Sequence, residues 1–196
     1  TDRLIASLQD WLRQHPDDEM RYATLGAAYM QKVRENGDPA YYGKAESVLQ
    51  KATSLKPSDA DVITSLGVLA LARHQFAVGL DYGRQARKLN AYSARALGVI
   101  VDAQVELGDY ANAPLSTQAM VNLRPDMSSY ARVSYVRELY GDRDGALDAM
   151  RQAAEAGSGT AENVAWTRRH SGLMRYNRGD RTGAMNEYAE ERRERT

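Results

Sequence analysis

The chain has 196 residues, with 26 basic and 26 acidic side chains and no cysteine, so its formal net charge is zero. The lack of cysteine excludes a disulfide scaffold and any thiolate metal site, and the charge balance provides no long-range field to attract nucleic acid or an anionic membrane. No apolar run approaches the roughly 18 residues of a membrane span, and no basic segment followed by an apolar one opens this sequence, so we expect no signal peptide. The compartment therefore stays open, with the cytoplasm favoured. The start at Thr1 also suggests a fragment of a longer protein.

Strong helix formers dominate the composition and strand-like alternation is missing, so an all-α fold is expected. Pro114, near the start of one expected helix, either removes at most one backbone hydrogen bond or shifts that helix start. In chain order, the spacing of apolar residues predicts eleven helices, over 3–14, 18–35, 41–55, 59–73, 76–89, 93–107, 110–123, 127–140, 143–156, 162–178 and 181–194.

Two short patterns recur along the sequence. A Gly-Asp pair begins at positions 108, 141 and 179, and an alanine follows five residues after each glycine. Steps of 34 residues relate an aromatic residue (42, 76, 110), a small residue (45, 79, 113) and a leucine (55, 89, 123). Glycine accepts the left-handed conformation that ends a helix, and aspartate caps the next helix. One such helical hairpin cannot bury both of its apolar stripes, so stacked copies, and hence a solenoid, are expected.

These patterns resemble the tetratricopeptide repeat family over nearly the whole chain. The first unit matches eight signature positions: Tyr22, Leu25, Gly26, Tyr29, Ala45, Leu49, Ala52 and Pro57. Later units match at Leu66, Gly67, Gly79 and Ala86; at Leu97, Ile100, Ala113 and Pro125; at Tyr130, Val133, Ala146, Met150 and Ala153; and at Gly172, Ala184 and Tyr188. The resemblance implies a right-handed α-solenoid of stacked helix-turn-helix hairpins.

We expect a single solenoid over 1–196, in which the helix before residue 16 resembles the second half of an earlier unit. The expected units are 1–16 as a leading helix, 17–57, 58–91, 92–125 and 126–158 as repeats, and 159–196 as a degenerate fifth repeat or capping pair.

Two departures from the repeat pattern stand out. The first repeat is seven residues longer than the others, which is about two helical turns. This insertion is either a rim that contacts a partner through Tyr41 or, the reading we favour, a tolerated insertion. Gly79 and Gly83 share one helix face and indicate either close packing or a soft joint, and packing accounts less well for Gly83.

No catalytic or metal-binding constellation is found in the sequence. His15, His74 and His170 lack a second histidine at ligand spacing, and the glycine-rich stretch 157–160 lacks the lysine of a phosphate loop. The arginines between 168 and 181 are followed by residues of both charges, which is typical of a solvated face. We therefore expect no cofactor, no metal, no nucleic-acid partner, no membrane insertion and no enzyme activity.

The resemblance implies that the first helix of each hairpin lines a concave groove. The candidate partner-binding residues are Met20, Ala27, Met30, Thr64, Val68, Leu71, Arg95, Asp102, Glu106, Tyr135, Glu138, Trp166, Arg169 and Tyr176. Helix 59–73 is apolar almost all round, so Val68 and Leu71 need cover from a ligand peptide, a partner chain or the helix 3–14. A carboxylate clamp of the kind found in some relatives is disfavoured, because only Arg95 could serve in it.

The expected function is a non-catalytic scaffold or adaptor that binds a peptide or helix of a partner protein in this groove. Two alternatives are a homo-oligomerisation module, and a regulatory or sensory segment of a larger enzyme or transcription regulator. The identity of the partner and its pathway lie beyond this sequence.

Overall fold

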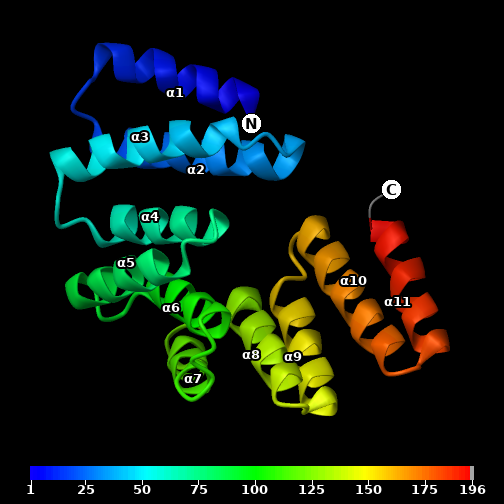
Figure 1. Cartoon of the computed structure of the whole chain (residues 1–196). Helices are drawn as coiled ribbons and strands as arrows, with labels where there is room; N and C mark the ends of the chain where they lie inside the picture. Colours follow the sequence, from blue (N-terminus) through cyan, green and yellow to red (C-terminus); the bar gives the residue numbers. More distant parts are fainter. Residues whose placement is uncertain (195–196) are drawn as a thin grey trace. The chain divides into compact units, whose positions relative to one another are not determined.

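The computed structural model describes residues 1–194 and shows eleven α-helices and no strand in that range, so the expected all-α fold is confirmed (Figure 1). The helices are α1 (Asp2–Gln14), α2 (Glu19–Asn36), α3 (Ala40–Leu55), α4 (Ala60–Ala72), α5 (Phe76–Leu89), α6 (Ala94–Glu106), α7 (Ala113–Leu123), α8 (Met127–Leu139), α9 (Arg143–Ala156), α10 (Ala161–Asn177) and α11 (Arg181–Glu194).

Every helix boundary lies within one residue of its predicted position, except the start of α7. That helix begins at Ala113 instead of residue 110, with Asn112 as its N-cap and Pro114 in its first turn. A proline in the first turn lacks an N–H that would have no partner inside the helix in any case. Pro114 therefore shifts the start of the helix, which was one of the two alternatives that the sequence left open.

The chain divides into two compact units, Thr1–Gly108 and Asp109–Thr196, and each is described by itself. The boundary falls inside the predicted third repeat, 92–125, and places α6 in the first unit and α7 in the second. Whether the whole chain forms one continuous solenoid stays a prediction.

The first unit contains two helical hairpins, α2–α3 and α4–α5, flanked by α1 and α6. The first helices of the repeats lie side by side, because α4 packs against both α2 and α6. One apolar core joins residues of α1, α2, α3 and α4, and Leu49 at its centre is completely buried.

Glycines bring the helices of this unit close together. A Cβ atom added at Gly79 would lie 2.9 Å from Leu71 Cδ2, and one added at Gly83 would lie 2.8 Å from Ile100 Cγ1. Both glycines therefore serve close packing, Gly79 within the α4–α5 hairpin and Gly83 between α5 and α6. Packing therefore accounts for Gly83 as well as for Gly79, although the repeat pattern explains Gly83 less well.

The seven-residue extension of the first repeat lengthens α2 and α3 and gives α1 a surface to pack on. The Lys32 ammonium pairs with Asp2 at 2.7 Å, and Gln9 Nε2 donates to the Tyr29 hydroxyl at 2.9 Å. Tyr41 is half-buried against the same core, with its ring 5.9 Å from that of Tyr29. Tyr41 is therefore packed against the unit, although residues 35–40 before it are exposed, and this favours the structural interpretation over a partner contact through Tyr41.

The second unit contains the hairpins α8–α9 and α10–α11, with α7 packed on α8 and α10 packed on α9. The Gly-Asp pairs that join the helices of each hairpin behave as predicted. Gly141 and Gly179 have φ of 80° and 84°, and the carboxylates of Asp142 and Asp180 accept hydrogen bonds from backbone N–H groups three residues later. Both hairpin turns are thus encoded locally.

Two turns lack the combination of a left-handed glycine and an aspartate that caps the next helix. At Gly108, where φ is 76°, the carboxylate of the following Asp109 accepts hydrogen bonds from the Asn112 side chain instead of capping the next helix. Between α4 and α5 the left-handed residue is His74, with φ of 57° and its ring edge-on to Phe76. A residue with a Cβ atom in this conformation is strained.

Candidate functional site

The predicted groove residues fall into two sets, nine on α2, α4 and α6 of the first unit and five on α8 and α10 of the second. In the first unit, Met20 and Ala27 of α2 are exposed, as are Arg95 and Glu106 of α6. Asp102 is half-buried. The Arg95 guanidinium donates to the Ser65 hydroxyl at 3.0 Å, so part of its hydrogen-bonding capacity is used inside the protein.

Two residues predicted for the groove of the first unit lie in its core, so that part of the prediction is wrong. Met30 is 5% exposed and belongs to the cluster that joins α1 to α4. Thr64 is 0% exposed, and its hydroxyl donates to the carbonyl of Ala60 at 2.7 Å in the preceding turn. For Met30 the cause is helical phase, since a shift of one residue turns a side chain by about 100° and the next residue, Gln31, is half-buried. Thr64 differs, because both of its neighbours, Ile63 and Ser65, are buried as well.

Val68 and Leu71 are half-buried, and the protein itself supplies much of the cover that the sequence indicated was needed. Val68 packs against the core cluster, and Leu71 lies over Gly79 of α5. An aspartate in place of Leu71 would therefore disrupt the α4–α5 hairpin as well as any bound ligand. Leu71 is a poor position for testing partner binding.

In the second unit, three predicted residues come together in one cavity of about 270 Å³ between α8 and α10, which we call the α8–α10 groove. Its lining consists of Ala131, Ser134, Tyr135 and Glu138 of α8, Met150 of α9, and Trp166, His170, Leu173, Met174 and Asn177 of α10. The α8 residues are spaced by three and four, as are those of α10, so each set forms one stripe along its helix. The two stripes face each other across the cavity.

Bulky side chains hold α8 and α10 apart. No Cα atom of α8 comes within 8 Å of one in α10, whereas α4 and α6 of the first unit approach each other within that distance. At the bottom of the groove the Ser134 hydroxyl donates to the Ala146 carbonyl at 2.8 Å, and its oxygen is 3.8 Å from Met174 Sδ. The separation leaves room for a ligand between the two helices.

Trp166 is fixed from one side and open from the other. The ring of His170 lies against it, with a centroid separation of 3.8 Å and a tilt of 32°, and His170 Nδ1 lies 2.8 Å from the Trp166 carbonyl oxygen. Trp166 nevertheless remains 39% exposed and Leu173 50% exposed. A positioned aromatic ring beside an exposed leucine is suited to bury an apolar side chain of a partner.

A second cavity, of about 470 Å³, lies at the amino end of α8 and shares Ala131 and Trp166 with the α8–α10 groove. Its other lining residues are mostly polar: Asp126, Met127, Ser128, Arg132, Ala156, Gly157 and Asn163. The two cavities thus follow α8 from a lining of mixed polarity to a more apolar one.

The remaining two predicted residues of this unit, Arg169 and Tyr176, are exposed on α10 and line neither cavity. Of the residues that line the α8–α10 groove, sequence reasoning missed Ser134, Met150, His170, Met174 and Asn177. The signal was available for α10, because residues 166, 170, 173 and 177 form one helical stripe that begins at Trp166.

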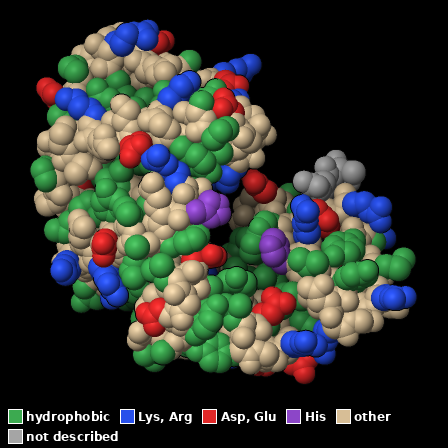
Figure 2. Space-filling model, viewed as in Figure 1, with side chains coloured by type: hydrophobic (Ala, Val, Ile, Leu, Met, Phe, Trp, Pro, Cys, Tyr) green, Lys and Arg blue, Asp and Glu red, His purple; other side chains and the backbone are tan. Residues whose placement is uncertain are grey.

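The turn that carries α10 into α11 has one clear electrostatic feature. The backbone N–H of Gly183 and the guanidinium of Arg175 hold the pKa of the Asp180 carboxyl below its ordinary value. Within residues 1–194, no group of three or more histidine, aspartate or glutamate side chains could hold a metal ion, and no helix is long and apolar enough to cross a membrane. Charged side chains of both signs are mixed with apolar ones over the visible face of each unit (Figure 2).

Comparison with known proteins identifies the fold. Neither a protein-family model nor a curated protein matches the sequence. Among solved structures, TTC0263, a thermophilic TPR protein of Thermus thermophilus, is 18% identical, with 88% of this chain and 89% of that chain covered and a TM-score of 0.77.

Two further structures extend this likeness. YrrB, described as a TPR protein with an unusual peptide-binding site, is 16% identical over 92% of this chain and 88% of its own, with a TM-score of 0.56. Cut9, in the Cut9–Hcn1 hetero-tetramer of the APC/C, is 13% identical over 97% of this chain and 36% of its own, with a TM-score of 0.81. The fold of this chain is therefore that of the tetratricopeptide repeat proteins.

Proposed function

We propose that the chain is a non-catalytic protein-binding module and that the α8–α10 groove holds an amphipathic helical segment of a partner protein. The observation that carries this proposal is the pair of facing stripes, in which Tyr135, Trp166 and Leu173 leave apolar surface exposed inside a cavity. Exposed apolar surface gathered in a concave site is the common mark of a binding site.

The dimensions favour a short helix as the ligand. α8 has 13 residues, which corresponds to about 20 Å of helix, and the two cavities, which share Ala131 and Trp166, follow it over most of that length. A ligand helix of about three turns presents apolar side chains at every third or fourth position. Its apolar side would meet Tyr135, Trp166 and Leu173, while Glu138 and Asn177 at the rim would pair with its polar side.

YrrB supports peptide binding as a use of this fold, since it is described as having a peptide-binding site. The exposed predicted residues of the first unit, Met20, Ala27, Arg95 and Glu106, remain candidates for partner contact within that unit, as do the half-buried Val68 and Asp102.

Selection of ligands from a random peptide library by the purified chain would test the proposal, followed by affinity measurements with the selected peptide. Trp166→Ala should weaken binding by about 2 kcal/mol, which is the usual loss at an aromatic hot spot. Leu173→Asp should abolish measurable binding, because a carboxylate would then face the apolar side of the ligand.

The matched control is Met185→Asp, which also introduces a carboxylate on the last hairpin at an exposed apolar residue, outside both cavities. This variant should bind like the unchanged chain. Circular dichroism would first show that both variants are folded. If Leu173→Asp then binds the peptide as tightly as Met185→Asp does, the α8–α10 groove is not the binding site.

Self-association is a second candidate function. Large apolar side chains are exposed away from the groove as well, including Tyr92 at 83% and Met185 at 71%. Sedimentation at several concentrations separates the two candidates. A dimer that dissociates in Leu173→Asp would identify the groove ligand as a second copy of the chain.

A further inference from the structure

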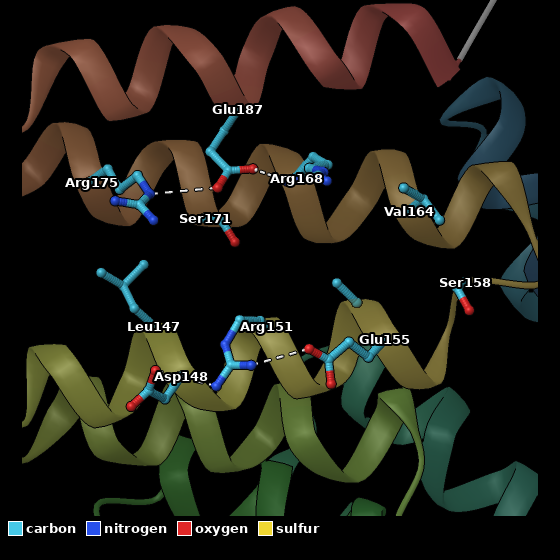
Figure 3. Close-up of a pocket in the computed structure, with 11 residues that line it drawn as sticks. Leu147, Asp148, Arg151, Glu155, Ser158, Val164, Arg168, Ser171, Arg175 and Glu187 are labelled. Atoms are coloured by element: carbon cyan, nitrogen blue, oxygen red, sulfur yellow. Dashed lines mark hydrogen bonds and ion pairs between the residues drawn. The ribbon is translucent and has the colours of Figure 1, made fainter.

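The second unit has another cavity, of about 510 Å³, bounded by α9, α10 and α11 and separate from the α8–α10 groove (Figure 3). We call it the α9–α11 pocket. It has a half-buried apolar part formed by Leu147, Ala154 and Val164, and charged side chains on opposite sides. Its volume is within the range of sites that bind small ligands or peptide side chains.

On the α10 side, two guanidiniums share one carboxylate inside the pocket. Glu187 of α11 lies between Arg168 and Arg175, with oxygen–nitrogen distances of 2.9 Å to Arg168 Nη1 and 3.5 Å to Arg175 Nε (Figure 3). The side chain of Glu187 is only 15% exposed, whereas those of Arg168 and Arg175 are 42% and 36% exposed. Even with Asp180 outside the pocket pairing with Arg175, the accessible surface of this wall is basic.

On the α9 side the arrangement is reversed, because two carboxylates share one guanidinium. Arg151 pairs with Glu155 at 3.1 Å and with Asp148 at 3.7 Å, and all three side chains are about two-thirds exposed. This wall carries a net negative charge. Among the described residues, no ion pair joins Asp148, Arg151 or Glu155 to the charged residues of the opposite wall.

Ser171 lies between the two arginines on α10, three residues after Arg168 and four before Arg175, and its side chain points into the pocket (Figure 3). It is half-buried, and its hydroxyl has no hydrogen-bond partner among the described residues. Most serines in helices donate to the preceding turn, as Ser65 does here. A donor that stays unused between two guanidiniums is placed to bind a carboxylate of a ligand.

We propose that the α9–α11 pocket binds an extended segment of another protein in which acidic and basic residues alternate. In an extended chain successive side chains point to opposite sides, so one set would face Arg168, Ser171 and Arg175 while the other faced Asp148 and Glu155. The charges of the two walls set this orientation. A uniformly acidic segment would meet repulsion from the α9 wall, and a uniformly basic one from the α10 wall.

This second site is independent of the proposed function of the α8–α10 groove. The probe is a synthetic eight-residue peptide of alternating glutamate and lysine, titrated into the full chain and followed by the backbone amide signals of Ser171 and Val164. Its matched control is a peptide of the same composition with the four glutamates first and the four lysines last. The alternating peptide should bind about tenfold more tightly, a ratio typical of one additional charge-assisted hydrogen bond.

Two variants test the wall that binds the acidic side chains. Ser171→Ala leaves every ion pair in place and should weaken binding of the alternating peptide several-fold. Glu187→Gln removes the internal carboxylate that competes with the ligand for both guanidiniums, so it should tighten binding, whereas a merely structural Glu187 would leave the affinity unchanged or lower it.

The outcomes separate the two sites. Leu173→Asp should leave binding of the alternating peptide unchanged, even if it abolishes binding in the α8–α10 groove. Equal affinity for the alternating and the block peptide would overturn the proposal, as would an affinity that neither Ser171→Ala nor Glu187→Gln changes. If Glu187→Gln fails to fold, the Ser171→Ala variant and the two peptides still decide the matter.

Discussion

The two units build the first helices of their hairpins from different residues, and this difference decides where the protein offers a groove. In the first unit, α4 buries eight of its 13 residues, among them Val62, Ile63 and Leu69. In the second, α8 is of the same length but buries only Ser129, Ser134 and Val136. Both are first helices of a hairpin, yet one is enclosed by neighbouring helices and the other lines a cavity.

The cause lies in the size of the side chains where first helices face each other. Gly67 of α4 lets α6 approach, since a Cβ atom there would lie 2.9 Å from Val99 Cγ1. Between α8 and α10 the facing residues include Tyr135, Trp166 and Met174. Bulky residues that cannot interlock hold helices apart, whereas glycine allows direct contact. The same repeat can therefore produce either a closed core or an open groove.

The tightest contact of the first unit gives the largest expected effect. Leu49 of α3 is completely buried, and a Cβ atom added at Gly26 would lie 2.7 Å from its Cγ. Leu49→Ala should lower the free energy of unfolding by about 3 kcal/mol, as buried leucines usually do. Gly26→Ala should also destabilise, because Leu49 would have to move.

The double variant Gly26→Ala/Leu49→Ala sharpens this test, because the new methyl group fills part of the space that the leucine leaves. Its cost should be clearly smaller than the sum of the two single costs. Urea unfolding followed by circular dichroism measures all three values. Strict additivity would show that the two residues are not packed against each other and would weaken the contrast between a tight first unit and an open second one.

Much of this fold could be predicted from sequence because its signals are local. Helix boundaries followed from caps, from Gly-Asp turns and from apolar spacing, and the error at α7 arose where Pro114 competes with the repeat pattern. The candidate site depended instead on helical phase and on contacts between helices. Met30 lies one step of helical rotation away from the half-buried Gln31, whereas Thr64 is buried because helices surround α4. No local pattern reveals the separation of α8 from α10.

The hairpin turns of the two units provide a second comparison with a smaller expected effect. His74 and Gly141 both adopt a left-handed conformation, but only glycine does so without strain. His74→Gly should raise the free energy of unfolding by about 1 kcal/mol, and Gly141→His should lower it by about the same amount. Thermal and urea unfolding would measure both shifts.

The contact between His74 and Phe76 requires a control. His74→Ala removes that ring contact but keeps a Cβ atom in the strained conformation, so it should give no gain in stability. If His74→Ala stabilises the chain as much as His74→Gly, backbone strain is not the reason, and the α4–α5 turn is not weaker than the α8–α9 turn.

The smallest expected effect concerns pH and the α10–α11 turn. The pKa of Asp180 is lowered from its ordinary value of 3.8 by the Gly183 N–H and by Arg175. A carboxyl whose pKa is lower in the folded state stabilises that state fully above its unfolded pKa, and this contribution is lost as the pH falls through the folded value. The stabilisation should therefore be present at pH 5 and above and fade below about pH 4.

Asp180→Asn isolates this contribution, because asparagine still caps a helix but carries no charge for Arg175. The difference in unfolding free energy between the unchanged chain and this variant should be constant from pH 7 to pH 5 and shrink towards pH 3. If the difference in unfolding free energy instead grows as the pH falls, the charge of Asp180 destabilises the α10–α11 hairpin, which would contradict this prediction.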